Sequence, residues 1–154
     1  MFTDFVGFSK ISSNYGDIDE FLSVLGGFFE VFDEITSQRF IEKIKTIGDS
    51  YMCVGGLPRV NRSHPFDTVL AAIEIQRFIH DKAVQAAMEG KPVWNLRIGI
   101  HTGSVIAGVI GKRKFAYDIW GDTVNIASRM ETASEPGKVN ISQTTYSYIK
   151  DYFV

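Results

Sequence analysis

The sequence predicts an α/β domain, and three patterns of apolar residues carry this prediction. Apolar residues recur at spacings of three and four between Ile18 and Ile35, which is typical of one face of a helix. Residues 40–47 and 96–100 instead alternate in polarity, as strands do. The predicted elements follow the order strand, helix, strand, strand, helix, strand. That order defines a ferredoxin-like βαββαβ core, which a C-terminal strand and helix extend.

The N-terminal half contains a strand and two helices with clear boundaries. Residues 1–5 form the first predicted strand. The helix of residues 18–35 contains Gly26-Gly27, which either allows close packing or is a tolerated weak spot. Ser63-His64-Pro65 begins the second helix, and Gly90 lies where it ends.

The second and third strands are predicted to form a hairpin. Gly48-Asp49 lies at the turn, and residues 51–54 run back as the third strand. Strict alternation in the second strand is expected to place four side chains on one face: Ile41, Lys43, Lys45 and Ile47.

The C-terminal half begins with another predicted hairpin, over residues 105–119. Its basic tip, residues 111–114, is interpreted as a solvated turn. A third helix follows Gly121 and ends before Pro136. A short strand and a final helix, which reaches about Lys150, complete the predicted fold.

Composition excludes several classes of protein. With 154 residues, 45% of them hydrophobic, the chain is long enough for one domain with a core. The net charge of −2 argues against a nucleic-acid partner. Cys53 is the single cysteine, so no disulfide forms within the chain, and the three histidines show no spacing typical of zinc. The single cysteine suits a reducing, cytoplasmic compartment, and the sequence leaves membrane attachment of a parent protein open.

Two aspartates are expected to meet at one edge of the sheet. In a split βαβ sheet the first and third strands are neighbours. Asp4 ends the first strand, and Asp49 leads into the third. Adjacent carboxylates repel one another, and a pair of divalent cations relieves the repulsion. Two such metal ions can catalyse phosphoryl transfer, although each aspartate alone could simply serve a turn.

Two further groups could contact a nucleotide. The backbone of Gly7, Phe8 and Ser9 forms a bend that could hold phosphate oxygens or merely end a strand. Asn125 and Arg129 are four residues apart and share a helix face, where they could meet a sugar and a phosphate. From spacing alone, an ordinary ion pair of a surface arginine is favoured.

Four segments match one family pattern in the same order along the chain. They are MFTDFVGFS (residues 1–9), KIKTIGDSYM (43–52), LRIGIHTG (96–103) and YDIWGDTVNIASRM (117–130). These segments closely resemble the catalytic domain of class III nucleotidyl cyclases, of the adenylyl cyclase type. The resemblance covers residues 1–154 as one domain, and several long motifs in order are far more specific than a short signature.

The resemblance implies that the 3′-hydroxyl of ATP attacks the α-phosphate, giving 3′,5′-cyclic AMP and pyrophosphate. It places Asp4 and Asp49 at the positions that bind two Mg²⁺ or Mn²⁺ ions, with help from the backbone carbonyl of Phe5. Asn125 would orient the ribose, and Arg129 would stabilise charge on the α-phosphoryl group. Phosphate-contacting positions fall on Arg97 and on the backbone of Gly7, Phe8 and Ser9.

The resemblance also implies how the chain assembles. In this family the two sets of residues come from different subunits of a head-to-tail dimer. Because the chain carries both sets, we expect a homodimer with two equivalent sites. The family places another phosphate-binding lysine in a hairpin beyond the last helix, and we expect this chain to lack that hairpin. We also expect the chain to be a piece of a longer protein with fused regulatory or sensor domains.

Lys45 and Asp118 occupy positions that resemble the family's purine-reading pair. Adenine offers an acceptor at N1 and donors at N6, which suit a lysine donor and a carboxylate acceptor. Guanine reverses both groups, and each mismatch costs on the order of 1–3 kcal/mol. The sequence therefore favours ATP.

Three other functions remain open at this stage. Asp122 is common in guanylyl cyclases, so cyclic GMP formation is the nearest alternative. A diguanylate cyclase or polymerase palm domain shares the paired aspartates, but the chain has no GGDEF segment. A nucleotide-binding regulatory module without turnover is the third.

Overall fold

The computed structural model describes residues 1–153, and Val154 lies outside the described residues. A five-stranded sheet with the strand order β2-β3-β1-β4-β7 forms its centre. All neighbouring strands are antiparallel except β4 and β7. The first and third strands are therefore neighbours, which confirms the predicted ferredoxin-like core. The strands are β1 (Phe2–Phe5), β2 (Ile41–Ile47), β3 (Ser50–Gly55), β4 (Leu96–Ile100) and β7 (Val139–Ile141).

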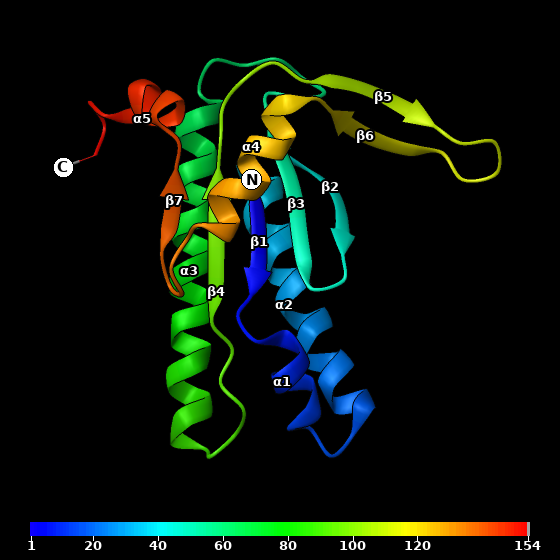
Figure 1. Cartoon of the computed structure of the whole chain (residues 1–154), viewed down its shortest axis with the longest axis vertical. Coiled ribbons are helices and arrows are strands. Elements are labelled where there is room, and N and C mark those ends of the chain that lie inside the picture. Colours follow the sequence, from blue (N-terminus) through cyan, green and yellow to red (C-terminus); the bar gives the residue numbers. More distant parts are fainter. Residues whose placement is uncertain (154) are drawn as a thin grey trace.

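Helices cover both faces of this sheet unequally. Figure 1 shows α2 and α3 behind the sheet and α4 in front of it. The strands β5 (Ile106–Ile110) and β6 (Ala116–Trp120) form a separate hairpin that extends away from the body (Figure 1). The helices are α1 (Phe8–Ser13), α2 (Ile18–Gln38), α3 (His64–Met88), α4 (Asp122–Thr132) and α5 (Gln143–Ile149). Within the described part of the chain, no helix is long and apolar enough to cross a membrane.

The main core lies between the sheet and the helices α2 and α3. Phe5 is at its centre, with its ring 5.0 Å from Trp94 and 5.7 Å from Phe28, measured between centroids. The indole N–H of Trp94 donates to the hydroxyl of Tyr15 at 2.8 Å, so its one polar atom is satisfied. This core fixes β1 and therefore the residues that follow it.

A smaller core lies on the opposite face, beneath α4. It consists of the side chains of Phe2, Met52, Ile119 and Ala127. Alternation along β1 explains the division, because Phe2 and Asp4 share this face while Phe5 points to the other. Asp4 is thereby directed to the side that α4 covers only in part.

The alternation predicted for β2 is wrong after Lys43. Lys43 pairs with Cys53, but Lys45 pairs with the adjacent Met52, so Ile44 is the extra residue of a β-bulge. Lys43 consequently faces α2, where its Nζ is 3.2 Å from a carboxylate oxygen of Asp33. Lys45 is turned to the opposite face. A sequence pattern with period two could not show this shift.

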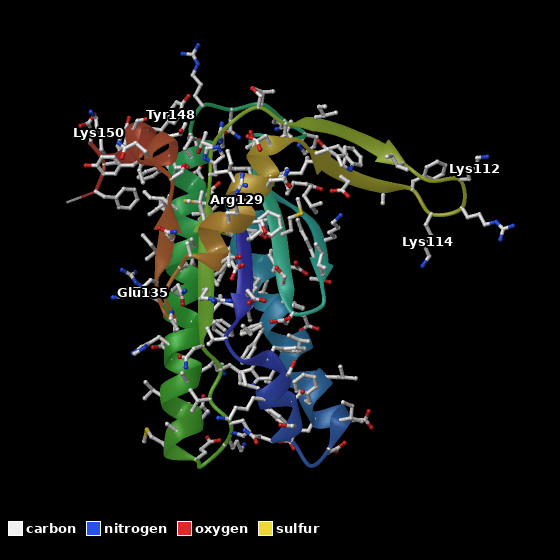
Figure 2. All side chains as sticks on the ribbon, viewed as in Figure 1. Lys112, Lys114, Arg129, Glu135, Tyr148 and Lys150 are labelled. Carbon is white, nitrogen blue, oxygen red and sulfur yellow. The ribbon has the colours of Figure 1, made fainter. Side chains whose placement is uncertain are left out.

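Two other expectations need correction or addition. The short helix α1 was not predicted, because six residues are too few to show a helical period. Gly26 and Gly27 do not serve close packing, since an added Cβ at either would meet no atom within 4 Å. The tip of the β5–β6 hairpin, residues 111–114, is exposed as predicted, and Figure 2 shows Lys112 and Lys114 at its end.

Candidate active site

The turn between β2 and β3 brings Asp49 next to Asp4. Asp49 Oδ2 accepts a hydrogen bond from the backbone N–H of Phe5 at 3.2 Å, which anchors the turn to the end of β1. Burial, a hydrogen bond with Asp4 and the negative charge of Asp4 together raise the pKa of Asp49 to about 6, and burial contributes most. The predicted juxtaposition of the two carboxylates is therefore present.

This pair of carboxylates fits divalent metal ions. Two close carboxylates repel one another when both are charged, and a cation that binds between them relieves this repulsion. Among residues 1–153, no group of three or more His, Cys, Asp or Glu side chains converges as a metal site. Mg²⁺ suits such an incomplete set, since it commonly takes one or two carboxylates and completes its shell with water and substrate phosphates.

Arg97 lies on β4, directly beside the carboxylate pair. Its Nη2 donates to Asp4 Oδ2 at 3.0 Å. Its Nε is 3.3 Å from Glu131 Oε1, which comes from α4. The guanidinium thus holds one acid of the pair and places its positive charge beside the two aspartates.

The sequence did not predict a role for Glu131. It is buried, and burial raises the pKa of its carboxyl, as does the charge of Asp4. A signal existed, because Glu131 follows Ala127 by four residues and therefore continues the buried stripe of α4. A carboxylate on an apolar stripe indicates a buried partner.

The segment of Gly7, Phe8 and Ser9 leads from β1 into α1. Gly7 has a φ of 66°, a left-handed conformation that glycine adopts at little cost. The ring of Phe8 packs in the main core, 5.3 Å from that of Phe21. Any contact of Phe8 with a phosphate must therefore come from its backbone, as the resemblance implied.

Lys45 and Asp118 form a second cluster in front of the sheet. Lys45 Nζ donates to Asp118 Oδ2 at 2.7 Å, and Asp118 Oδ1 accepts from the backbone N–H of Ile119 at 2.7 Å. The hydrogen bond from Lys45 lowers the pKa of the Asp118 carboxyl. This side chain is consequently ionised and held in one orientation.

A cavity of about 520 Å³ adjoins this pair. Phe2, Met52 and Ile119 supply apolar surface, and Lys45 and Asp118 supply the polar groups. Flat apolar walls with a few convergent polar groups are typical of sites that hold an aromatic ligand. The cavity is therefore a candidate for the purine base.

Asn125 and Arg129 both lie on the exposed side of α4, but only Asn125 lines the cavity. Arg129 is 69% exposed, and its Nη2 is 3.8 Å from Asp122 Oδ1, which makes a weak surface contact. Figure 2 shows Arg129 on the side of the sheet that α4 occupies. Its side chain is free to reach a ligand that approaches this face.

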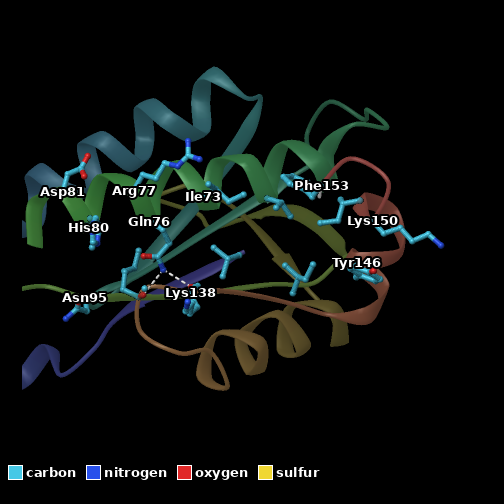
Figure 3. A pocket seen from close by; sticks show the side chains of 17 residues that line it. Ile73, Gln76, Arg77, His80, Asp81, Asn95, Lys138, Tyr146, Lys150 and Phe153 are labelled. Carbon is cyan, nitrogen blue, oxygen red and sulfur yellow. Dashed lines mark hydrogen bonds between the residues drawn. The ribbon is translucent and has the colours of Figure 1, made fainter. Parts of the chain in front are cut away.

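A larger cavity of about 870 Å³ lies elsewhere, between α3, β7 and α5. Figure 3 shows Gln76 in this cavity, where its amide donates to the carbonyls of Leu96 and Lys138 at 2.8 and 2.9 Å. None of the predicted site residues lines it. It opens on the α3 side of the sheet, away from Asp4 and Asp49.

The geometry and the sequence define one class of protein. Over residues 1–154 the chain matches the family described as the adenylate and guanylate cyclase catalytic domain. The chain belongs to this family, the class III nucleotidyl cyclase catalytic domains.

Curated relatives include enzymes of both specificities. An adenylate cyclase of Mycobacterium tuberculosis (strain ATCC 25618 / H37Rv) is 40% identical over 157 residues, which cover 100% of this chain and 34% of that protein. The receptor-type guanylate cyclase gcy-8 of Caenorhabditis elegans is 38% identical over 154 residues, which cover 99% of this chain and 13% of that protein. The chain thus spans about a third of the length of the adenylate cyclase that it matches.

Solved structures similar to this chain also include both adenylyl and guanylyl cyclases. The adenylyl cyclase CyaB of P. aeruginosa superposes with a TM-score of 0.92 and 29% identity, over 99% of this chain and 80% of that one. The guanylate cyclase domain of RhGC from Catenaria anguillulae, in complex with GTP, gives a TM-score of 0.88 and 34% identity, over 99% of this chain and 81% of that one. The predicted fold class is confirmed.

Proposed function

We propose that this chain is an adenylyl cyclase domain, which converts ATP into 3′,5′-cyclic AMP and pyrophosphate. The single observation that carries the choice of ATP is the Lys45–Asp118 pair beside the 520 Å³ cavity. The lysine can donate to N1 of adenine, and the carboxylate can accept from its N6 amino group. Guanine would place its N1–H against the lysine donor and its O6 against the carboxylate acceptor. Each of these two mismatches costs on the order of 1–3 kcal/mol.

The proposed reaction is an in-line displacement. The ribose 3′-hydroxyl loses its proton to water, and its oxygen forms a bond to the α-phosphorus. The bond from the α-phosphorus to the oxygen that bridges the α- and β-phosphates breaks, and pyrophosphate leaves. When bound, two divalent ions would lower the pKa of the 3′-hydroxyl and neutralise the triphosphate. Asp4 and Asp49 would hold these ions, and Arg97 would contact phosphate oxygens.

Two residues of α4 would complete the site. Asn125 can hydrogen-bond the ribose from the wall of the cavity. Arg129, exposed on the same helix, can approach the α-phosphoryl group and stabilise the charge that develops in the transition state. Their exposure is consistent with a site that a second molecule closes.

A homodimer is part of this proposal. Among the described residues, Asp4 and Asp49 lie outside the lining of the cavity that holds Lys45, Asp118 and Asn125. A second copy of the chain, placed against this face, would supply the set that each cavity lacks. Related structures are described as a non-canonical dimeric and a monomeric guanylyl cyclase domain, so the assembly needs a direct test.

Guanylyl cyclase activity is the second candidate, because guanylate cyclases are among the relatives. One experiment separates the two. The purified protein is incubated with Mn²⁺ and either ATP or GTP, and the products are identified by mass spectrometry. Cyclic AMP as the main product supports the proposal. Predominant cyclic GMP favours the alternative, and no cyclic nucleotide indicates a module without turnover.

A further inference from the structure

Three charged side chains form a chain that runs from α4 to the metal-binding pair. Glu131 Oε1 of α4 lies 3.3 Å from Arg97 Nε, and Arg97 Nη2 lies 3.0 Å from Asp4 Oδ2. The side chains are 10%, 28% and 27% exposed, in the order Glu131, Arg97, Asp4. Partial desolvation strengthens such ion pairs relative to those at a free surface.

The two contacts of Arg97 differ in quality. The contact with Asp4 has the geometry of a hydrogen bond. The contact with Glu131 has the distance of an ion pair, but neither Arg97 Nε nor Glu131 Oε1 has a hydrogen-bond partner. A buried donor and a buried acceptor that face each other without a formed bond gain stability if the guanidinium rotates toward the glutamate.

The position of Glu131 is fixed by the backbone. An added Cβ at Gly99 of β4 would overlap the backbone of Met130 and Glu131, so α4 rests directly on the strand. Gly99 and Arg97 are two residues apart and lie on the same face of β4. Glu131 and Arg97 therefore both lie on regular elements, α4 and β4, and not on loops, so their relative position is fixed.

A metal ion at Asp4 competes with the guanidinium for the same carboxylate. Both are cations, and the 3.0 Å hydrogen bond to Arg97 occupies Oδ2, an oxygen that a metal would coordinate. If the metal displaced Arg97 from Asp4 and no second acid were present, the guanidinium would have no anionic partner. It would then either stay as an unpaired cation next to the metal or move away from the site. Glu131 provides that second acid.

We propose that Glu131 is a positioning residue, which retains the Arg97 guanidinium beside the site when a metal ion replaces it at Asp4. Arg97 then presents Nη2 to a substrate phosphate instead of to Asp4. This inference rests on the metal-binding function proposed above, and it adds a residue that acts through Arg97 without touching substrate or metal.

The test measures binding of Mn²⁺ directly, by electron paramagnetic resonance, in the protein without nucleotide. Glu131→Gln should weaken Mn²⁺ binding at least about 3-fold, because Arg97 then pairs with Asp4 alone. Arg97→Met should strengthen Mn²⁺ binding, because the competing cation is gone. In the Arg97→Met background, Glu131→Gln should change the affinity by less than about 2-fold.

A second readout is the KM for ATP. Both Glu131→Gln and Arg97→Met should raise it, although their effects on Mn²⁺ affinity are opposite in sign. Glu135→Gln is the matched control, since Glu135 is an exposed glutamate just beyond α4 (Figure 2) and its loss should leave both quantities within about 2-fold of wild type. A residue that only stabilised the fold would not produce opposite signs.

The outcomes distinguish failure of the proposed metal binding from failure of the role proposed for Glu131. Equal weakening of Mn²⁺ binding by Glu131→Gln in both backgrounds would mean that the glutamate acts as a plain negative charge, and the inference would be wrong. If wild type binds no Mn²⁺, the metal function and the inference both fail. Should circular dichroism show that Glu131→Gln does not fold, Glu131→Asp replaces it and should shift the affinity in the same direction by a smaller factor.

Discussion

Lys45 Nζ lies 2.7 Å from Asp118 Oδ2, although 73 positions separate the two residues in the chain. They come from β2 and β6, which belong to different sheets. The lysine side chain is 46% exposed and the carboxylate 17%, so this contact stabilises the fold little but orients both groups at the cavity. This geometry is the basis of the base-reading role proposed above for the two residues.

The base preference should change when the two charges change. In Lys45→Glu with Asp118→Cys, glutamate can accept from N1–H and N2–H of guanine, and no carboxylate opposes O6. We expect the ratio of kcat/KM for GTP to that for ATP to rise at least about 10-fold, which corresponds to one or two mismatches removed. Each single change should mainly impair the use of ATP.

The control for this prediction is Lys43→Glu, which alters the neighbouring lysine on the other side of the bulge. Lys43 faces Asp33 of α2 and not the cavity, so its substitution should leave the ratio unchanged. If the ratio in a folded, active double variant does not move toward GTP, Lys45 and Asp118 do not read the base.

Loss of one aspartate should abolish turnover without unfolding the protein. In Asp49→Ala a single carboxylate remains, and one carboxylate cannot hold two metal ions. We expect activity to fall by at least about 100-fold, the size typical when a metal or electrostatic stabilisation is lost. The far-ultraviolet circular dichroism spectrum should match that of wild type. Cyclic nucleotide production within a few-fold of wild type would refute the metal assignment.

The raised pKa of Asp49 predicts a pH-dependent effect on stability. The pKa is about 6 in the folded protein, above the ordinary value of 3.8. Between these two values the folded protein binds more protons than the unfolded chain, so the contribution of Asp49 to stability falls as the pH rises through this window. Above pH 6 the ionised carboxylate next to Asp4 is destabilising when no metal is bound.

Asp49→Asn removes this charge and keeps an oxygen for the Phe5 N–H. In the presence of a chelator we expect the Tm to rise by about 2 °C or more at pH 7.5, and to change little at pH 4, where wild-type Asp49 is already protonated. Thermal unfolding followed by circular dichroism at the two pH values measures both. If the Tm rose equally at pH 7.5 and at pH 4, ionisation of Asp49 would not be the cause of the increase.

The shared-site proposal predicts complementation. Asp4→Ala lacks a metal ligand, and Arg129→Ala lacks the proposed contact with the α-phosphoryl group, so each protein alone should be nearly inactive. In a mixed dimer, one of the two sites is built from undamaged halves. Mixing should therefore restore up to about a quarter of wild-type activity if the subunits exchange at random, with half of the dimers mixed.

Analytical ultracentrifugation with one fluorescent partner verifies that mixed dimers form. Absence of restored activity despite mixed dimers would place the complete site within one subunit.

The fold was largely predictable because its signals are periodic and local. The amphipathic helix α2 and the alternating strand β4 show their periods over many residues, and turn residues separate the elements. The neighbouring position of Asp4 and Asp49 followed from topology alone, since the first and third strands of this core are adjacent. The six-residue helix α1 gave no such signal.

What the sequence did not predict depends on exceptions to periodicity. The bulge at Ile44 reverses the face of Lys45, and strict alternation would have directed this lysine toward α2. Glu131 belongs to the site only because Gly99 lets α4 rest on β4, a contact between segments distant in sequence. The bulge depends on how β2 pairs with β3, and the contact at Gly99 is tertiary, so the period of a single segment shows neither feature.

The most direct test of the central claim is the ratio of kcat/KM for ATP to that for GTP in the wild-type protein, measured with Mn²⁺ and with the cyclic products identified. The Lys45–Asp118 pair predicts a ratio of about 100 or more in favour of ATP, the discrimination expected when guanine mismatches two polar groups. A ratio below one, with cyclic GMP as the main product, would contradict the assignment of this chain as an adenylyl cyclase.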